Sequence, residues 1–197
     1  MSGLNIGKQY DELAEWWASY HQNSEYGVAA LKRALSFASS GGRALDVGCG
    51  AGGRLAKLLE QQGFALTGLD ASEKMIALAR KAHPQGDFTA INIQDWSAKG
   101  SFNIILAWDS LFQLPLDQQE PVLTKLCDAL AEGGVLLHSF GDAVGMHMDK
   151  WRDQIFQYSS IGVTRNLEIL TSNGLVLRHL ELDQFPEKHA YAIAQKL

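Results

Sequence analysis

Residues 44–53 read ALDVGCGAGG, and this stretch decides the fold that the sequence predicts. An apolar run typical of a buried strand ends at its glycines, and a helical pattern of leucines begins directly after them. Glycine lets the chain turn tightly and lets a ligand reach the main-chain N–H groups, because no Cβ stands in the way. Gly48, Gly50 and Gly53 fit the G-x-G-x-x-G spacing of nucleotide-binding turns, although a tight turn without a ligand has the same pattern.

Two acidic residues near this turn favour a bound ligand. Asp70 ends the second predicted strand, where an acid can accept hydrogen bonds from both ribose hydroxyls of an adenosine group. Its alternative role, the N-cap of the next helix, suits Ser72 better. Asp46 lies inside the apolar first strand, where a carboxylate is costly unless it meets a partner. Because Asp46 would repel a pyrophosphate and attract an ammonium or sulfonium group, it favours a cationic ligand over a dinucleotide.

Short apolar segments alternate with helical patterns along most of the chain, which is typical of βαβ units and a mainly parallel sheet. Strands are expected at residues 44–47, 65–69, 88–92, 103–107, 135–140, 176–181 and 188–194. Helices are expected between them at residues 53–62, 73–83, 117–131 and 163–173. Only residues 182–187 separate the last two strands, and so short a connection requires antiparallel pairing. We therefore expect an α/β fold with a Rossmann-like doubly wound seven-stranded mixed sheet and an antiparallel last strand.

The length of 197 residues is expected to form one domain. Residues 8–21 and 25–39 show amphipathic helical patterns, and residues 1–40 are predicted to form an N-terminal helical cap over the cofactor site. Residues 41–197 are predicted to form the Rossmann-like core. The least regular stretch, residues 141–162, contains too many apolar side chains for a linker.

The composition excludes several classes of partner. The net charge is −5, from 17 basic and 22 acidic residues, and nucleic-acid binding usually requires a clustered basic face. No run of residues is apolar enough to span a membrane, and the N-terminus lacks a secretory signal pattern. Two cysteines form no disulfide framework, so we expect a cytoplasmic protein. We also expect a monomer or a homodimer without a nucleic-acid or membrane partner.

Five motifs, in this order, resemble those of the class I S-adenosylmethionine-dependent methyltransferases. The stretch LDVGCGAGG resembles their first motif, and TGLDASEKMIALAR resembles their second. Residues 93–96 match the place where an acid commonly holds the adenine amino group and an apolar neighbour covers the ring. Residues 107–115 resemble the fourth-strand motif, with Trp108 where the family often has Tyr, Cys or Phe, and AEGGVLLHSFG resembles the turn before the fifth strand. The resemblance is firm over residues 40–140 and is silent on the methyl acceptor.

This resemblance implies S-adenosylmethionine as cofactor, S-adenosylhomocysteine as product and a set of residues that bind them. The predicted cofactor-binding residues are Tyr10, Asp46, Gly48, Cys49, Gly50, Asp70, Ala71, Met75, Asp95, Trp96 and Trp108. Residues expected at the carboxyl ends of the strands, where an acceptor would bind, are Trp16, Trp17, Tyr20, Phe112, His138 and Asp183.

A methyl group on a sulfonium transfers once a nucleophile is aligned with it, so the family needs no universal catalytic residue. Candidates for proton transfer are His147, His189 and Tyr158, whereas His21, His83 and His179 are expected on the surface. No metal site is predicted, because Asp183, Glu187 and His189 form no compact ligand motif.

The main hypothesis is a methyltransferase that acts on a small molecule by in-line transfer. The chain lacks the Asn/Asp-Pro-Pro-Tyr/Phe tetrapeptide of enzymes that methylate amino groups of nucleic acids, and residues 109–112 read DSLF in its place. The alternatives are an NAD-dependent oxidoreductase and a non-catalytic regulatory protein that binds the cofactor. Asp46 and the reversed last strand count against the oxidoreductase.

Overall fold

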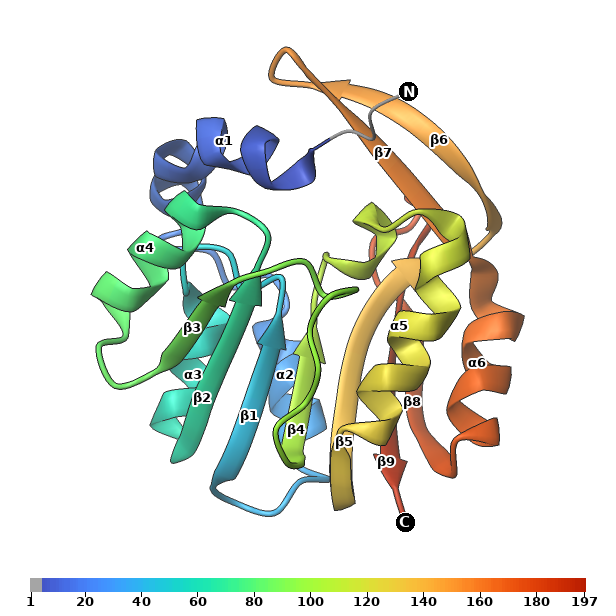
Figure 1. The fold of residues 1–197 in the computed structure, drawn as a ribbon. Helices are drawn as coiled ribbons and strands as arrows, with labels where there is room; N and C mark the ends of the chain where they lie inside the picture. The colour runs from blue at the N-terminus through green and yellow to red at the C-terminus, as the bar shows by residue number, and fades with distance from the viewer. Residues whose placement is uncertain (1–4) are drawn as a thin grey trace.

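A seven-stranded mixed sheet forms the centre of the molecule (Figure 1), in a computed structural model that describes residues 5–197. Its strands, in spatial order, are β3 (Asp87–Ala90), β2 (Phe64–Asp70), β1 (Gly42–Val47), β4 (Phe102–Ala107), β5 (Leu130–Gly141), β9 (His189–Lys196) and β8 (Leu175–Leu182). The first five strands pair in parallel, and β9 is antiparallel to both of its neighbours. The predicted Rossmann-like sheet with a reversed last strand is confirmed.

Helices cover both faces of this sheet (Figure 1). The helices α2 (Val28–Leu35), α3 (Arg54–Gln61) and α4 (Glu73–Ala82) pack on one face, and α5 (Leu116–Asp128) and α6 (Gly162–Ser172) pack on the other. The central strand β1 is buried from residue 44 to residue 47, which is why its sequence is apolar apart from Asp46. The apolar faces of the helices bury leucine and isoleucine side chains, each worth about 1.5–3 kcal/mol when fully buried.

The stretch expected to be irregular forms a second, two-stranded sheet. The strands β6 (Val144–Trp151) and β7 (Gln154–Ile161) pair antiparallel as a hairpin. Its two-residue turn consists of Arg152 and Asp153, both with positive φ (47° and 62°), the conformation that a tight hairpin turn requires. Such a turn is usually marked by Asn-Gly or Asp-Gly, and this turn has neither. The outer strand β6 is almost entirely exposed, so it also lacks the alternation of apolar and polar residues that predicts a strand.

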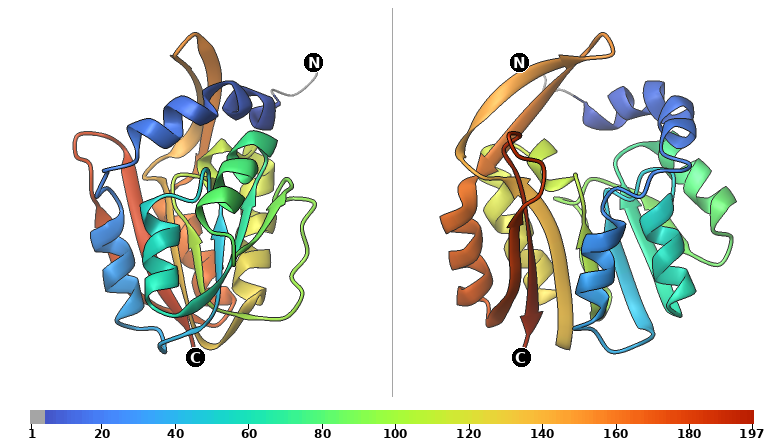
Figure 2. Two further views of the ribbon diagram at one scale, coloured as in Figure 1. Left: turned by 90° about the vertical axis from the view of Figure 1, so that its left-hand side faces the viewer. Right: turned by 180° about the vertical axis from the view of Figure 1, so that it is seen from behind.

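One end of the main sheet is covered by the hairpin and by α1 (Ile6–Tyr20). Both lie over the carboxyl ends of the parallel strands, as the two views of Figure 2 show. The N-terminus of α4 holds α1 in place, because Asp11 accepts hydrogen bonds from the Ser72 hydroxyl (2.6 Å) and the Lys74 amide (2.9 Å). Ser72 is also the N-cap of α4, as predicted, since its hydroxyl accepts from the Met75 amide.

Between residues 5 and 197, no helix has both the length and the apolar character needed to cross a bilayer.

Candidate cofactor and acceptor site

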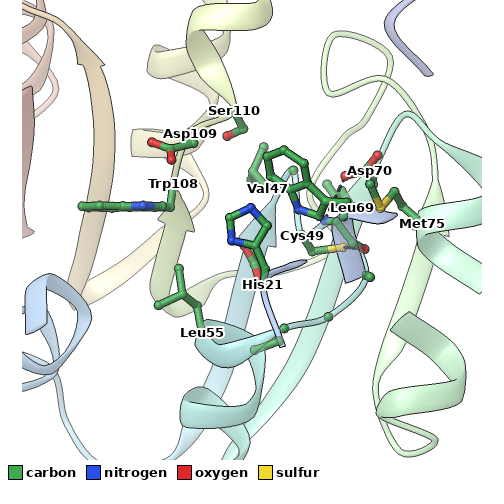
Figure 3. Close-up of a pocket in the computed structure, with 18 of the residues that line it drawn as sticks. His21, Val47, Cys49, Leu55, Leu69, Asp70, Met75, Trp108, Asp109 and Ser110 are labelled. Atoms are coloured by element: carbon green, nitrogen blue, oxygen red, sulfur yellow. Dashed lines mark hydrogen bonds between the residues drawn. The ribbon is translucent and has the colours of Figure 1, made fainter. Parts of the chain in front are cut away.

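A cavity of about 1600 Å³ opens at the carboxyl ends of the parallel strands, beneath α1. Its walls come from the ends of β1, β2 and β4, from the turn after β3, and from α1. Figure 3 shows Asp70 and Met75 on one side of the cavity and Trp108 and Asp109 on the other. A pocket for one small ligand usually measures about 300–1,000 Å³, so this cavity has room for two small molecules.

The glycine-rich turn forms the floor of the cavity between β1 and α3. Gly48 has a φ of +74°, and a Cβ on it would lie 2.4 Å from the Cβ of Ser110, so only glycine fits there. A Cβ on Gly50 would lie no closer than 3.7 Å to any neighbour, so this part of the turn is open toward the cavity. The turn therefore leaves room for a ligand beside its backbone.

Asp70 joins the glycine turn to the start of α4. One carboxylate oxygen accepts a hydrogen bond from the Gly50 amide (2.9 Å), and the other accepts from the Ser72 amide (2.8 Å). Burial raises the pKa of Asp70 more than these amides lower it. Each oxygen keeps a second lone pair that can accept a ligand hydroxyl.

Asp46 is a buried carboxylate without a hydrogen-bond donor among residues 5–197, although it lines the cavity. Burial, with a further contribution from the nearby charge of Asp70, raises the pKa of Asp46 to about 7. A cationic group in the cavity would supply the partner that this carboxylate lacks.

Five residues that line the cavity each contain a buried polar atom without a hydrogen-bond partner within residues 5–197. These atoms are Oε1 of Gln9, Nδ1 of His21, Nε1 of Trp108, Oγ of Ser110 and Oε1 of Gln113. A buried polar atom without a partner costs about 1–3 kcal/mol. Residues 5–197 therefore leave these five polar groups around the cavity unsatisfied.

Aromatic contacts join α1 to the hairpin and form a roof over the cavity. The ring of Tyr10 lies 5.4 Å from that of Phe156, and the ring of Trp17 lies 5.9 Å from that of Trp151. The Gln9 side chain also donates a hydrogen bond to the main-chain oxygen of Ile155 (2.8 Å). This roof shields the cavity from solvent on the side of α1.

Most of the predicted cofactor-binding residues meet at this cavity, and their contacts with a cofactor stay predictions. Those that line it are Tyr10, Asp46, Gly48, Cys49, Gly50, Ala71, Asp70, Met75 and Trp108.

Asp95 and Trp96 do not line the cavity, contrary to their predicted role in binding adenine. Asp95 is exposed, and Trp96 packs against the core beside Phe102. The cavity is lined instead by residues 91–94. The prediction rested on the resemblance of residues 93–96 to a family motif, and of these four residues only Ile93 and Gln94 line the cavity.

Of the predicted acceptor-site residues, Trp17 alone lines the cavity within residues 5–197. Trp16 and Tyr20 stack on each other at 4.6 Å, and Trp16 also contacts Trp151 of the hairpin (5.2 Å). Phe112 packs against Tyr158 of the hairpin (5.6 Å), and Tyr158 stacks on the exposed His147 (5.2 Å). None of these three rings lines the cavity.

His138 is a core residue and not part of the acceptor site, contrary to its assignment. It is 1% exposed, and its Nε2 lies 3.1 Å from the Asn166 side-chain oxygen. Burial lowers the pKa of His138 to about 4, so the ring stays neutral near pH 7.

Asp183 and His189 lie outside the cavity wall but contact it through Asp109. His189 Nε2 is 2.9 Å from Asp109 Oδ1, and His189 Nδ1 is hydrogen-bonded to Asp183. Asp109 itself lines the cavity. Sequence reasoning assigned no role to Asp109, although it directly follows Trp108 at the carboxyl end of β4, which is the signal that could have identified it.

Three more residues at or near the cavity were missed. Arg54 lines the cavity, and its guanidinium donates a hydrogen bond to the main-chain oxygen of Tyr26. His21 was expected on the surface but lines the cavity. His83, also expected on the surface, is 5% exposed and lies between Glu60 (2.5 Å) and the main-chain oxygen of Gly52 (2.6 Å). Their partners are distant in sequence or lie on other elements, so no local pattern revealed them.

Within the described part of the chain, no three His, Cys, Asp or Glu side chains are grouped so that they could hold a metal ion.

A family model described as a methyltransferase domain matches residues 19–181. A protein of Geobacillus sp. (strain WCH70), provisionally named a methyltransferase, is 27% identical over 199 residues, which cover 88% of this chain and 80% of that protein. Trans-aconitate 2-methyltransferase of Rhizobium etli is 32% identical over 104 residues, 52% of this chain and only 40% of that enzyme. In structure, the chain is similar to magnesium protoporphyrin IX methyltransferase of Synechocystis PCC 6803 with bound S-adenosylmethionine (TM-score 0.66, 18% identity, 100% of this chain and 86% of that chain). Since the family model spans most of the sequence, the chain belongs to the methyltransferase family, with the fold of the S-adenosylmethionine-dependent enzymes.

Proposed function

We propose that this protein is an S-adenosylmethionine-dependent methyltransferase that acts on a small molecule by in-line transfer. The observation that carries the proposal is the cavity in which the carboxylates of Asp46 and Asp70 lie beside the glycine turn. The family match supports methyl transfer, and the cofactor bound in the similar structure supports S-adenosylmethionine as the donor.

The walls of the cavity fit the parts of this cofactor. In this proposal Asp70 accepts hydrogen bonds from the ribose hydroxyls, and the turn at Asn92 and Ile93, which lines the cavity, contacts adenine. Asp46 compensates the positive charge of the methionine part of the cofactor. Arg54 is the nearby cation for the carboxylate of that methionine part.

When bound, the cofactor supplies an activated methyl group on a sulfonium. The protein then has to hold the acceptor in line with this group and keep water away, because alignment alone lowers the barrier to transfer substantially. The roof of α1 and the hairpin serves the second task, since its aromatic side chains cover one side of the cavity.

A small molecule is the acceptor that the cavity favours. The cavity leaves space beside the cofactor for a second small ligand. The net charge of −5 gives no electrostatic attraction for nucleic acids. The relatives named for trans-aconitate also act on a small molecule, although the matched segment covers 40% or less of the first three of them.

Isothermal titration calorimetry is expected to give micromolar dissociation constants for S-adenosylmethionine and S-adenosylhomocysteine. The absence of heat with either compound at millimolar concentration would remove the proposal. NADH is the contrasting ligand, and energy transfer from the tryptophans to NADH would instead support the oxidoreductase. Transfer of a labelled methyl group to members of a metabolite panel distinguishes an enzyme from a non-catalytic binding protein.

The roof gives a second test through Gly7→Ala. A Cβ at position 7 would lie 2.3 Å from the main-chain oxygen of Ala71, so α1 has to move away from the cavity. Overpacking of this kind costs at least about 1 kcal/mol, so S-adenosylhomocysteine affinity is expected to fall about fivefold or more. Ser19→Ala, on the exposed face of the same helix, is the control and should leave the dissociation constant unchanged. Equal affinities for both variants would show that α1 does not cover the bound cofactor.

A further inference from the structure

The connection between β3 and β4 passes over the sheet without a helix. It runs from residue 91 to residue 101, and Trp96 within it packs on the same apolar cluster as α5. Figure 1 shows this connection and α5 on one face of the sheet. Because the connection has neither a helical nor a strand ladder, its main-chain carbonyls near the core need other donors.

Lys125 of α5 supplies the donors for three of these carbonyls. Its ammonium donates hydrogen bonds to the main-chain oxygens of Ile93 (2.9 Å), Gln94 (2.7 Å) and Trp96 (2.9 Å). An ammonium has three N–H donors and no acceptor, so this arrangement uses every donor that the side chain has. Hydrogen bonds from a charged donor are also stronger than those between neutral groups. One side chain thus fixes the direction of three carbonyls.

The charge of Lys125 is directed at these carbonyls and at no acid. No carboxylate of residues 5–197 forms an ion pair with the Lys125 ammonium. Lys125 lies in the last turn of α5, where the helix dipole favours a cation. That effect requires no contact with another segment, so it does not explain why all three donors converge on the connection after β3.

Part of this connection belongs to the cavity wall. Ile93 and Gln94 line the cavity, whereas Lys125 and Trp96 do not. In a trans peptide the C=O and the following N–H point in opposite directions, so the bond from Lys125 to the Ile93 oxygen turns the Gln94 N–H away from Lys125. No acceptor among residues 5–197 takes a hydrogen bond from this N–H. A residue of the cavity wall therefore keeps one main-chain donor free for a ligand.

We propose, on the basis of the function proposed above, that Lys125 is a positioning residue that makes the cofactor site selective for adenine. By holding the oxygens of Ile93 and Gln94, it fixes the Gln94 N–H as a donor toward the base. Adenine has an acceptor at N1, whereas hypoxanthine has an N–H there that would leave the same donor unpaired. A turn held by Lys125 therefore favours adenine over hypoxanthine, and a released turn loses this preference.

Lys125→Met tests the proposal, because methionine has a similar length and none of the three donors. S-Adenosylhomocysteine and S-inosylhomocysteine, which differ only in the base, are titrated into the full-length protein by calorimetry. The wild-type protein is expected to prefer the adenosyl compound at least tenfold. Lys125→Met should bind the adenosyl compound about tenfold more weakly and the inosyl compound less than threefold more weakly, so the preference falls to about threefold or less.

Lys196→Met is the matched control. The Lys196 ammonium also donates to main-chain oxygens, those of Cys127 (3.2 Å) and Leu130 (3.3 Å), but it lies outside the cavity. This variant should keep both dissociation constants, and thermal melts should show that both variants are folded. An equal weakening of the two ligands in Lys125→Met would mean that Lys125 only stabilises the fold, and the proposal would be wrong. Equal affinities of the wild-type protein for the two ligands would also overturn it.

The wild-type protein offers a second measurement that does not depend on the folding of any variant. In protein with ¹⁵N-labelled lysine, saturation with S-adenosylhomocysteine should shift the Nζ signal of Lys125 and slow the exchange of its protons, because a base bound to the turn restricts the carbonyls that Lys125 holds. The Nζ signal of Lys196 should stay in place. An unchanged Lys125 signal in the saturated protein would overturn the proposal, whereas failure to bind S-adenosylhomocysteine at all would reject the proposed function itself.

Discussion

Asp70→Ala is expected to weaken S-adenosylhomocysteine binding by about 1.5–3 kcal/mol, or about tenfold to 150-fold, since hydrogen bonds to a charged acceptor are lost. The carboxylate lies at the end of β2 and lines the cavity, with lone pairs left for the two ribose hydroxyls. Calorimetric titration of the variant and the wild-type protein measures the change.

The control for this prediction is Asp95→Ala. Asp95 is an exposed carboxylate outside the cavity, so the same loss of charge should leave the affinity unchanged. Asp70→Ala also removes the acceptors of the Gly50 and Ser72 amides, so a thermal melt must show that the variant is folded. Unchanged affinity in a folded Asp70→Ala would mean that the ribose acid has been misassigned. A loss in Asp95→Ala instead would restore the adenine role predicted from sequence.

Asp46→Asn is expected to stabilise the ligand-free protein and to weaken its binding of the cofactor. The pKa of Asp46 is about 7 in the folded protein and 3.8 as an unperturbed group. The folded protein thus binds the Asp46 proton more tightly than the unfolded chain does, and this binding stabilises the fold. The stabilisation is complete below about pH 4 and is lost as the pH rises through 7. At pH 8 the buried charge costs at most about 4 kcal/mol, and asparagine removes that cost. Thermal melts should show a Tm several degrees higher at pH 8 and little change at pH 4–5.

Ligand binding should respond to Asp46 in the opposite direction. The ammonium of S-adenosylhomocysteine favours the ionised carboxylate, so the affinity of the wild-type protein should fall as the pH drops below about 7. Asp46→Asn should bind about tenfold more weakly at pH 8, and its affinity should no longer depend on pH between 6 and 8. A destabilised Asp46→Asn at pH 8, or an unaltered pH dependence, would show that Asp46 has a structural partner instead.

Much of the fold could be predicted because its signals are local. The apolar run that ends at Val47, the glycines after it and the helical leucines fix one βα unit within a short stretch. Position 48 requires glycine because Ser110 approaches it closely in the folded protein. The G-x-G-x-x-G motif already predicted a glycine requirement at this position. The antiparallel last strand followed from the length of one connection.

The predictions that failed depended on side-chain directions or on exposed elements. Of the three carboxylates expected around one pocket, Asp46 and Asp70 line it and Asp95 does not, because the motif resemblance gives the position of the turn after β3 but not which of its side chains face the cavity. The hairpin of β6 and β7 escaped notice because its outer strand is exposed on both faces and therefore shows no alternation.

The sequence by itself determined the parallel sheet, the glycine turn and the two carboxylates at the ends of β1 and β2, since periodicity and motif spacing act over short distances along the chain. Only the tertiary structure decided how the cavity is roofed and which side chains meet at the end of β4. Asp109 and His189 are 80 residues apart, and they meet because β4 and β9 both border β5 with β9 reversed, which brings the end of one to the start of the other. No local pattern encodes such a contact, because it depends on the order and direction of whole strands.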